Sequence, residues 1–243
     1  MLFGKKKNHE TPDFSWIHTD MHSHMIPAID DGAQDIQGSL DMIKGLASLG
    51  YKKIITTPHV LWEMYPNTPE KINAGLDTVK SALKESSIDI AFHAAAEYYI
   101  DDHFDRYLRS KAPLLTLSGN IVLVEFSMIT APHQLPSIIF EMEIQNYQPV
   151  IAHPERYVYL ARNKEFYEDL KSSGCYFQLN LLSIAGVYGQ PVQELAEYLL
   201  KKNYYNYVGT DMHNARHLEL LQKVPASALK RLRDSGAIKN HLL

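Results

Sequence analysis

The chain has 243 residues, of which 45% are hydrophobic and 21% charged, and its formal net charge is −4. This composition is that of an ordinary globular protein, and the net negative charge disfavours a protein whose main task is to bind nucleic acid, which normally shows a basic face. The single cysteine, Cys175, excludes an intrachain disulfide bond, and no apolar run reaches the roughly 20 residues of a membrane helix, so we expect a reducing, cytoplasmic location.

The N-terminal segment carries three lysines, Lys5 to Lys7, without the apolar run of a secretory signal after them. We expect residues 1–15 to form a flexible, solvated tail, with weak contact to a membrane surface or a partner as the alternative. The remaining sequence contains neither a linker nor an internal repeat. Residues 16–243 are therefore expected to form one domain.

Segments with the pattern of β-strands alternate along the chain with segments of helical periodicity. The expected strands are residues 16–20, 53–57, 88–97, 120–126, 149–153, 175–180 and 205–210. The expected helices are residues 35–49, 67–83, 101–110, 136–145, 165–172 and 192–201, with further helical segments at the end. Repeated βα units predict a parallel α/β sheet, which could be an open doubly wound sheet or a closed barrel.

Histidines and carboxylates mark the ends of six of the seven expected strands. They are His22, His24, His59, Glu97, Glu125, His153, Asp211 and His213. In a β/α barrel these strand ends converge on one face, where the active site is built, whereas strand ends far from the switch point of an open sheet do not meet. The distribution therefore predicts a TIM-like barrel in a single domain.

These eight residues and Asp31 supply five imidazoles and four carboxylates. Any one of them could be an ordinary polar loop residue, and Asp31 could serve only the turn at Asp30-Asp31-Gly32. Together they would crowd acids without counter-ions, which divalent cations would neutralise. Because nine ligands are too many for one ion, we expect two or three ions, bridged by Glu97 and Glu125. Mn²⁺, Fe²⁺ or Zn²⁺ suits such ligands.

Hydrolysis is the usual chemistry of such a centre, because the ions lower the pKa of bound water to about 7 and hold the attacking and leaving oxygens. Arg156 and Arg216, each three residues beyond a predicted ligand, could bind phosphate oxygens as catalytic residues, or could form surface ion pairs. Cys175 is not followed by the arginine loop of cysteine-dependent phosphatases and is expected in the core. The sequence also lacks a G-x-S-x-G motif and a glycine-rich phosphate loop.

Several motifs extend beyond the ligands themselves. They are Asp20-Met21-His22-Ser23-His24, Asp30-Asp31-Gly32, Thr57-Pro58-His59, Glu97-Tyr98, Val124-Glu125-Phe126, Ala152-His153-Pro154-Glu155-Arg156-Tyr157 and Thr210-Asp211-Met212-His213-Asn214. In this order, over residues 17–216, the sequence resembles the PHP (polymerase and histidinol phosphatase) superfamily, and within it the bacterial manganese-dependent protein tyrosine phosphatases of capsule and exopolysaccharide clusters. The resemblance implies a distorted (β/α)₇ barrel, a trinuclear centre, and a tyrosine-phosphorylated tail of a partner kinase as the substrate.

The resemblance also implies a division of the ligands among the ions. One ion would be held by His22, His24, Glu97 and Asp211, a second by Asp31, His59, Glu125 and His213, and the third by Glu97, Glu125 and His153. Arg156 would orient the phosphate, and a metal-bridged hydroxide would attack phosphorus directly. The chain departs from the family pattern in placing Arg216 close to the D-M-H-N motif, where the family has an arginine farther along.

Other readings remain open. The same metal core would serve histidinol phosphate or another small phosphomonoester, and a non-catalytic adaptor could bind a kinase tail. An amidohydrolase is disfavoured because Glu125 stands where that group often has a bridging lysine. The segment Leu61–Pro66 could cradle a phosphotyrosine ring or merely cap the barrel.

Overall fold

The computed structural model describes residues 12–243, so residues 1–11 of the predicted tail lie outside the described residues. The rest of that tail is packed at Phe14, which is completely buried and stacks on Tyr51 with ring centroids 5.7 Å apart. Ordered packing therefore begins before residue 16, the predicted start of the domain. Within the described residues, no helix combines the length and the apolar character needed to cross a membrane.

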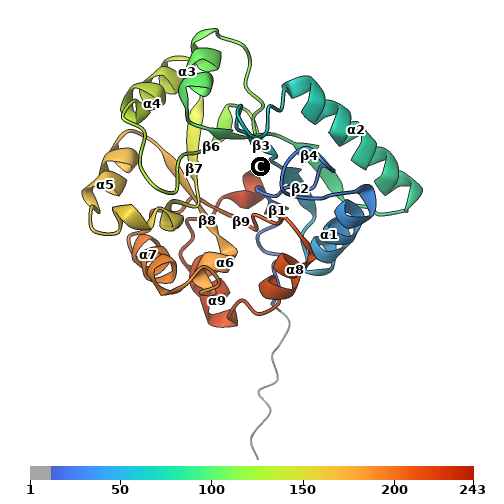
Figure 1. The fold of residues 1–243 in the computed structure, drawn as a ribbon. Helices are drawn as coiled ribbons and strands as arrows, with labels where there is room; N and C mark the ends of the chain where they lie inside the picture. Colours follow the sequence, from blue (N-terminus) through green and yellow to red (C-terminus); the bar gives the residue numbers. More distant parts are fainter. Residues whose placement is uncertain (1–11) are drawn as a thin grey trace, which may run out of the picture.

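The strands form the inner layer of the molecule and the helices surround them (Figure 1). The strands are β1 (Thr19–Asp20), β2 (Lys53–Thr56), β3 (His59–Val60), β4 (Ala91–Ala94), β5 (Glu97–Tyr99), β6 (Ile121–Glu125), β7 (Gln148–Ala152), β8 (Tyr176–Asn180) and β9 (Tyr207–Gly209). The helices are α1 (Ile36–Ser48), α2 (Pro69–Glu85), α3 (Asp102–Arg109), α4 (Leu135–Ile144), α5 (Glu165–Ser172), α6 (Leu181–Ile184), α7 (Gln190–Lys201), α8 (Ala215–Leu221) and α9 (Ala226–Asp234). Short 3₁₀ helices are η1 (Pro154–Arg156), η2 (Val158–Leu160) and η3 (Asn240–Leu242).

The strands pair in parallel in two sheets, of order β1-β2-β4 and β3-β5-β6-β7-β8-β9. The sheets are joined because β3 continues β2 and β5 continues β4 after short breaks. Hydrogen bonds carry the pairing across both breaks, since Ala95 N donates to Thr56 O at 2.8 Å and Glu97 N donates to Pro58 O at 3.1 Å. With each broken strand counted once, the described strands occupy the seven predicted positions.

The ring of strands closes between β9 and β1. Residues just beyond these strands form a parallel bridge between Ser23 and Met212, beside which His24 N donates to Met212 O at 2.9 Å. The buried carboxylate of Asp20 accepts hydrogen bonds from the backbone N–H and the hydroxyl of Thr210, at 2.9 and 3.0 Å. Side chains as well as backbone therefore hold the seam.

The end of the chain completes the closure. The side-chain amide of Asn240, which is fully buried, donates to Thr19 O of β1 at 2.8 Å and to Val208 O of β9 at 2.7 Å. Its Oδ1 accepts from Val208 N at 2.9 Å. Leu243 then packs inside the ring, where Figure 1 marks the C-terminus at the centre of the view. The fold is the predicted single-domain, distorted (β/α)₇ barrel.

Two apolar cores occupy opposite faces of the strands, because side chains alternate along a strand. The larger core fills the space between the strands and the helices. The smaller core fills the ring itself and contains Met21, Ile55, Ala95, Leu117, Leu123, Val150, Ala152, Tyr207 and Leu243. On β6, the residue two positions after Leu123 is Glu125, so the inward face changes from apolar to acidic at the carboxyl end of the strand.

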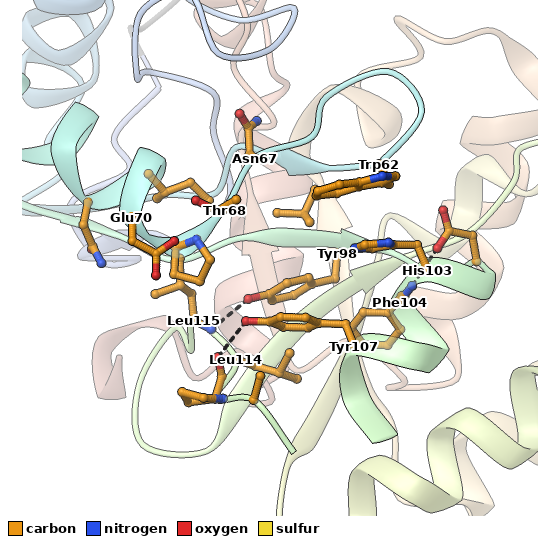
Figure 2. A pocket seen from close by; sticks show the side chains of 17 residues that line it. Trp62, Asn67, Thr68, Glu70, Tyr98, His103, Phe104, Tyr107, Leu114 and Leu115 are labelled. Carbon is orange, nitrogen blue, oxygen red and sulfur yellow. Dashed lines mark hydrogen bonds between the residues drawn. The ribbon is translucent and has the colours of Figure 1, made fainter. Parts of the chain in front are cut away.

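An apolar cavity of about 650 Å³ lies on the outer side of β3 and β5, against α2 and α3 (Figure 2). Val60 and Tyr98 line it, whereas His59 and Glu97, their neighbours in sequence, point to the opposite face of the same strands. The hydroxyl of Tyr98 is occupied by Leu115 N, at 2.8 Å. Because no predicted site residue lines this cavity, it is separate from the predicted chemistry.

Three elements differ from the sequence-based expectation. The first strand is limited to Thr19–Asp20, because His18 adopts a positive φ of 68° that breaks the extended chain. The predicted strand over residues 88–97 is two strands, β4 and β5, separated at Ala95-Ala96. The short elements β3 and α6 were not predicted. The other predicted strands and helices are confirmed to within a few residues.

Candidate metal centre

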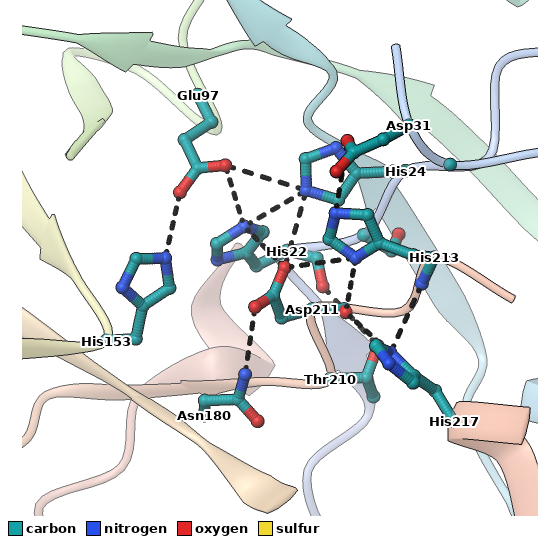
Figure 3. A network of polar contacts seen from close by, with 12 residues as sticks. His22, His24, Asp31, Glu97, His153, Asn180, Thr210, Asp211, His213 and His217 are labelled. Carbon is teal, nitrogen blue, oxygen red and sulfur yellow. Dashed lines mark hydrogen bonds and ion pairs between the residues drawn. The ribbon is translucent and has the colours of Figure 1, made fainter. Parts of the chain in front are cut away.

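The structure brings all nine predicted ligands together at the carboxyl ends of the strands, and Figure 3 shows seven of them. Their ligand atoms form four groups in which all atoms lie within 4.8 Å of one another: His24, Asp31, His59 and His213; His22, His24 and Asp211; His22, Glu97 and His153; and His59, Glu97 and Glu125. Four residues belong to two groups each, so the cluster is one continuous site. The groups overlap with the division among three ions that the resemblance implies without reproducing it.

Glu97, the first residue of β5, lies at the centre of the cluster and is completely buried. Its Oε2 is 3.2 Å from His22 Nε2, 3.5 Å from His24 Nε2 and 3.1 Å from His59 Nδ1. Its Oε1 is 3.2 Å from His153 Nε2. The two oxygens thus face different histidines, as a bridging carboxylate would.

Glu125, the last residue of β6, reaches two of the same rings. Its Oε1 is 3.0 Å from His59 Nδ1 and its Oε2 is 3.8 Å from His153 Nε2. On this side the cluster is open to solvent, because the side chains of Glu125 and His59 are 9% and 15% exposed and that of Asp31 is 53% exposed. A substrate would approach from this side.

Asp211 closes the buried side of the cluster. Its Oδ1 is 3.4 Å from both His22 Nε2 and His24 Nε2. Its Oδ2 accepts hydrogen bonds from Arg156 Nη1 at 2.8 Å and from Asn180 Nδ2 at 2.9 Å. Both oxygens are therefore fixed in direction, one toward the histidines and one toward the donors.

Polar residues behind the histidines orient their rings. His22 Nδ1 pairs with Gln178 Oε1 at 2.9 Å, and His24 Nδ1 pairs with Asp30 Oδ2 at 2.8 Å. These contacts turn both Nε2 atoms toward the centre, which is the usual way in which proteins orient metal-binding imidazoles. Gln178 and Asn180 were not predicted as site residues, and Asp30 was not predicted to orient a ligand. One feature of the sequence could have indicated Gln178 and Asn180: these two amide side chains stand two positions apart at the end of β8, which is the one predicted strand without a predicted ligand.

The charges of the cluster compensate one another. Burial lowers the pKa of His22, but the carboxylates of Glu97 and Asp211 outweigh burial and raise it to about 9. Burial likewise opposes the charged form of His59, whose pKa is raised to about 12 mainly by Glu97 and Glu125. Burial raises the pKa of Glu97, yet the two histidines hold it well below its ordinary value. These shifts favour the charged forms of Glu97, His22 and His59 in the metal-free protein, and a cation bound there would displace the protons of the two imidazoles.

The polar atoms at the centre fit a divalent cation. Glu97 Oε2 and His59 Nδ1, which are 3.1 Å apart, are both buried, and neither has a hydrogen bond of proper geometry to a described residue. Buried polar groups in proteins almost always have a partner, and an unpartnered carboxylate oxygen costs most. Imidazole nitrogens and carboxylate oxygens are also the donor set of Mn²⁺, Fe²⁺ and Zn²⁺. The residues present therefore fit a cluster of such ions.

Two glycines allow the close approach of the ligands. A Cβ atom on Gly209 would lie 2.7 Å from His22 Cβ and 2.8 Å from Gln178 Nε2. A Cβ atom on Gly32 would lie 2.1 Å from His24 O. Side-chain atoms cannot be accommodated at such distances, so both positions require glycine for the histidines to be placed.

The two predicted phosphate-binding arginines differ in position. Arg156, in η1, is ion-paired with Asp211, and its guanidinium lies over the ring of Tyr188, 4.8 Å from the centroid. Its side chain is 28% exposed, so Arg156 is partly accessible to solvent. Arg216 is exposed near the start of α8, and its backbone N–H donates to Asn214 Oδ1. Its guanidinium forms no ion pair with any described residue, and its phosphate-binding role remains a prediction.

The sequence of the chain matches a family model described as "Capsular polysaccharide synthesis, CpsB/CapC" over residues 18–233. Tyrosine-protein phosphatase YwqE of Bacillus subtilis is 29% identical over 198 residues, which cover 81% of this chain and 78% of that protein. Tyrosine-protein phosphatase CpsB of Streptococcus pneumoniae is 30% identical over 201 residues, which cover 80% of this chain and 82% of that protein.

Solved structures are also similar. A chain from a study of YwqE and CpsB, described as unique metal-dependent tyrosine phosphatases, aligns with a TM-score of 0.79 and 26% identity, over 91% of this chain and 89% of that chain. A histidinol phosphate phosphatase of Lactococcus lactis, solved with zinc, L-histidinol and phosphate, aligns with a TM-score of 0.52 and 15% identity, over 93% of this chain and 94% of that chain. The second likeness concerns the fold alone.

Proposed function

Because the chain belongs to the CpsB/CapC family of capsular polysaccharide synthesis, we propose that it is a metal-dependent protein tyrosine phosphatase. The observation that carries the proposal is the cluster itself. Nine histidines and carboxylates meet within ligand distance, eight from the ends of six strands and Asp31 from a turn, and the partly exposed side chain of Arg156 lies beside them. This combination suits the hydrolysis of a phosphate ester.

The nine clustered residues are proposed to hold two or three divalent ions, with Mn²⁺ as the resident metal. The ions would supply positive charge for the phosphoryl oxygens and lower the pKa of a water molecule toward 7. The protein's part is to present four carboxylates and five imidazoles in fixed directions. Gln178 and Asp30 hold His22 and His24, while Asn180 and Arg156 hold Asp211.

Arg156 is proposed to orient the phosphate. One arm of its guanidinium is held by Asp211, which leaves further N–H donors of the planar fork for phosphate oxygens. The ring of Tyr188 beneath it stays neutral, because burial above all raises the pKa of that phenol to about 12. The group that leaves from the substrate is a phenolate with a reference pKa of about 10, which needs little help from a proton donor.

The substrate is proposed to be the phosphotyrosine tail of a cytoplasmic tyrosine kinase that regulates capsular or exopolysaccharide synthesis. Two similarities support this proposal: the family is one of capsular polysaccharide synthesis, and the relative CpsB is a tyrosine-protein phosphatase. The single, buried cysteine is consistent with a reducing compartment.

Phosphate release from a phosphotyrosine peptide tests the proposal. The assay is run with added Mn²⁺ and, in parallel, with a chelator, and histidinol phosphate serves as the comparison substrate. We expect chelator-sensitive turnover that favours the peptide. Turnover of histidinol phosphate alone would assign the protein to small phosphomonoesters, and no turnover of either by metal-loaded protein would favour a kinase-tail adaptor.

A further inference from the structure

A groove of about 810 Å³ borders the open side of the metal centre. Leu61, Tyr99 and Ser127 line it at or just beyond the carboxyl ends of three neighbouring strands, since β3 pairs with β5 and β5 with β6. Each of the three stands two residues after a clustered residue, respectively His59, Glu97 and Glu125. The groove therefore continues the path of three adjacent strands outward from the cluster.

The distance from the clustered residues to the groove residues two positions later is close to the length of an aromatic side chain. Residues two positions apart on a strand point to the same face and are separated by about 6.6 Å. A phosphate held at the cluster through Glu125 and His59, the open side, would extend its phenyl ring along this step. The peptide backbone that carries the ring would then lie in the groove, whereas a shorter phosphoserine would draw its backbone against the cluster.

The loop after β3 gives the groove an apolar wall. Trp62 and Met64 line the groove and remain 46% and 64% exposed. The loop is fixed at two points, because Trp62 stacks on His103 with ring centroids 4.2 Å apart and Tyr65 stacks on His59 at 5.6 Å. Trp62 and His103 also line the outer cavity, where Figure 2 shows them stacked, so they form the wall between cavity and groove. The exposed apolar surface is thus held in place beside the site.

The charged residues of the groove are mostly acidic. Glu63, Asp101 and Asp102 line it together with one arginine, Arg106. One oxygen of Asp101 accepts from Phe104 N at the start of α3, and Asp102 accepts only from the neutral amide of Gln134. None of the three carboxylates is ion-paired with a lysine or arginine of the described chain. A basic side chain in the groove would supply the missing counter-charge.

We propose that this groove binds the polypeptide that flanks the phosphotyrosine, and that it selects flanking segments with lysine or arginine over acidic ones. The inference rests on the proposed phosphatase function and specifies its substrate. Trp62 and Met64 contact the flanking residues, and Glu63, Asp101 and Asp102 recognise their charge. Free phosphotyrosine fills the cluster but does not reach the groove.

The test compares three substrates: a phosphotyrosine peptide with lysines on both sides of the phosphotyrosine, the same peptide with glutamates, and free phosphotyrosine. We expect the wild-type kcat/KM for the lysine peptide to exceed that for the glutamate peptide by about tenfold. Trp62→Ala should lower kcat/KM for the lysine peptide by about tenfold, chiefly through KM, and leave free phosphotyrosine within about twofold. Trp62→Phe should restore most of the loss. Phe140→Ala, which removes an even more exposed aromatic (61% against 46% for Trp62) from α4, is the matched control and should change none of these values.

A charge reversal tests the selectivity separately. Glu63→Lys should reduce or invert the preference between the two peptides. The proposal is overturned if both peptides are hydrolysed equally by the wild type, or if Trp62→Ala slows free phosphotyrosine as much as the peptide. Peptide affinity is measured in parallel by isothermal titration calorimetry, which does not depend on Trp62 as a reporter. Binding that requires Trp62 without turnover would support the groove and contradict the phosphatase function, while turnover without such binding would do the reverse.

Discussion

Replacement of Glu97 by glutamine tests whether the cluster binds metal. Glu97 is completely buried, and its oxygens lie 3.1–3.5 Å from nitrogens of four histidines. It belongs to two of the four groups that could hold an ion. Glutamine keeps the shape of the side chain but removes its negative charge. The substitution therefore weakens half of the possible ion positions while it leaves the fold of β5 unchanged.

The size of the effect follows from binding linkage. An ion present at 100 times its dissociation constant stabilises the folded state by about 2.7 kcal/mol. In a chain of this length, 1 kcal/mol corresponds to a change in Tm of roughly 2–4 °C. Each ion should therefore raise the Tm of the wild type by about 5–11 °C. Because Glu97 serves two groups of four, we expect Glu97→Gln to lose at least half of the total shift.

Thermal unfolding followed by circular dichroism, with Mn²⁺ and with a chelator, measures the shift within each variant. Differences in the metal-free Tm between variants then cancel. Glu155→Gln is the matched control, because Glu155 is equally buried but accepts from Asn180 N and Tyr205 Oη, outside the cluster. The control should keep the wild-type shift. An undiminished shift in Glu97→Gln would refute the assignment of Glu97 as a ligand.

Three further predictions concern the residues around the cluster. Arg156→Ala should lower kcat/KM by about 100-fold or more and retain the metal-dependent Tm shift. Its loss in kcat/KM should be at least tenfold larger than that of Arg216→Ala, because of the two arginines only Arg156 contacts Asp211; an equal loss in the steady-state kinetics of both variants would contradict this prediction. Asn180→Ala should reduce kcat/KM by about tenfold, because Asp211 Oδ2 loses the hydrogen bond that Asn180 Nδ2 donates to it at 2.9 Å. Asn180→Asp should reduce kcat/KM further, because it places a second carboxylate beside that of Asp211; a more active Asn180→Asp than Asn180→Ala would contradict this geometry. Cys175→Ser should retain full activity, and Cys175 should resist alkylation in the native state, because burial raises its pKa to about 12; inhibition by iodoacetamide without unfolding would argue for a thiol mechanism.

The positions of eight of the nine ligands could be predicted because each follows a recognisable strand; Asp31 was added from the turn after the first strand. The apolar run of β6 ends on Glu125, and the parallel pairing then fixes where that carboxylate lies relative to the ends of neighbouring strands. The residues that orient the ligands could not be predicted in this way. Gln178 lies 156 residues from His22, and an amide inside a strand pattern carries no sign of its distant partner.

The breaks in the strands could not be predicted either, because the local sequence at each break is compatible with a continuous strand. Ala95 and Ala96 are compatible with an extended chain, so the sequence predicts one strand where β4 and β5 lie in different sheets. The positive φ of 68° at His18 could not be predicted either, since only a few per cent of non-glycine residues adopt a positive φ and a histidine alone does not indicate one. These features arise from the closure of the ring, which is a property of the whole chain.

The bridge that Asn240 forms between β1 and β9 joins residues that the ribosome makes at very different times. Thr19 and Asn240 are 221 residues apart, so at 5–20 residues per second the ribosome takes roughly 10–45 s to make the second after the first. During this interval His22 and His24 have been synthesised, but Asp211 has not yet joined them. A nascent chain therefore carries imidazoles able to bind metal well before it has a phosphatase site. The bridge between β1 and β9 can form only after Asn240 has been made.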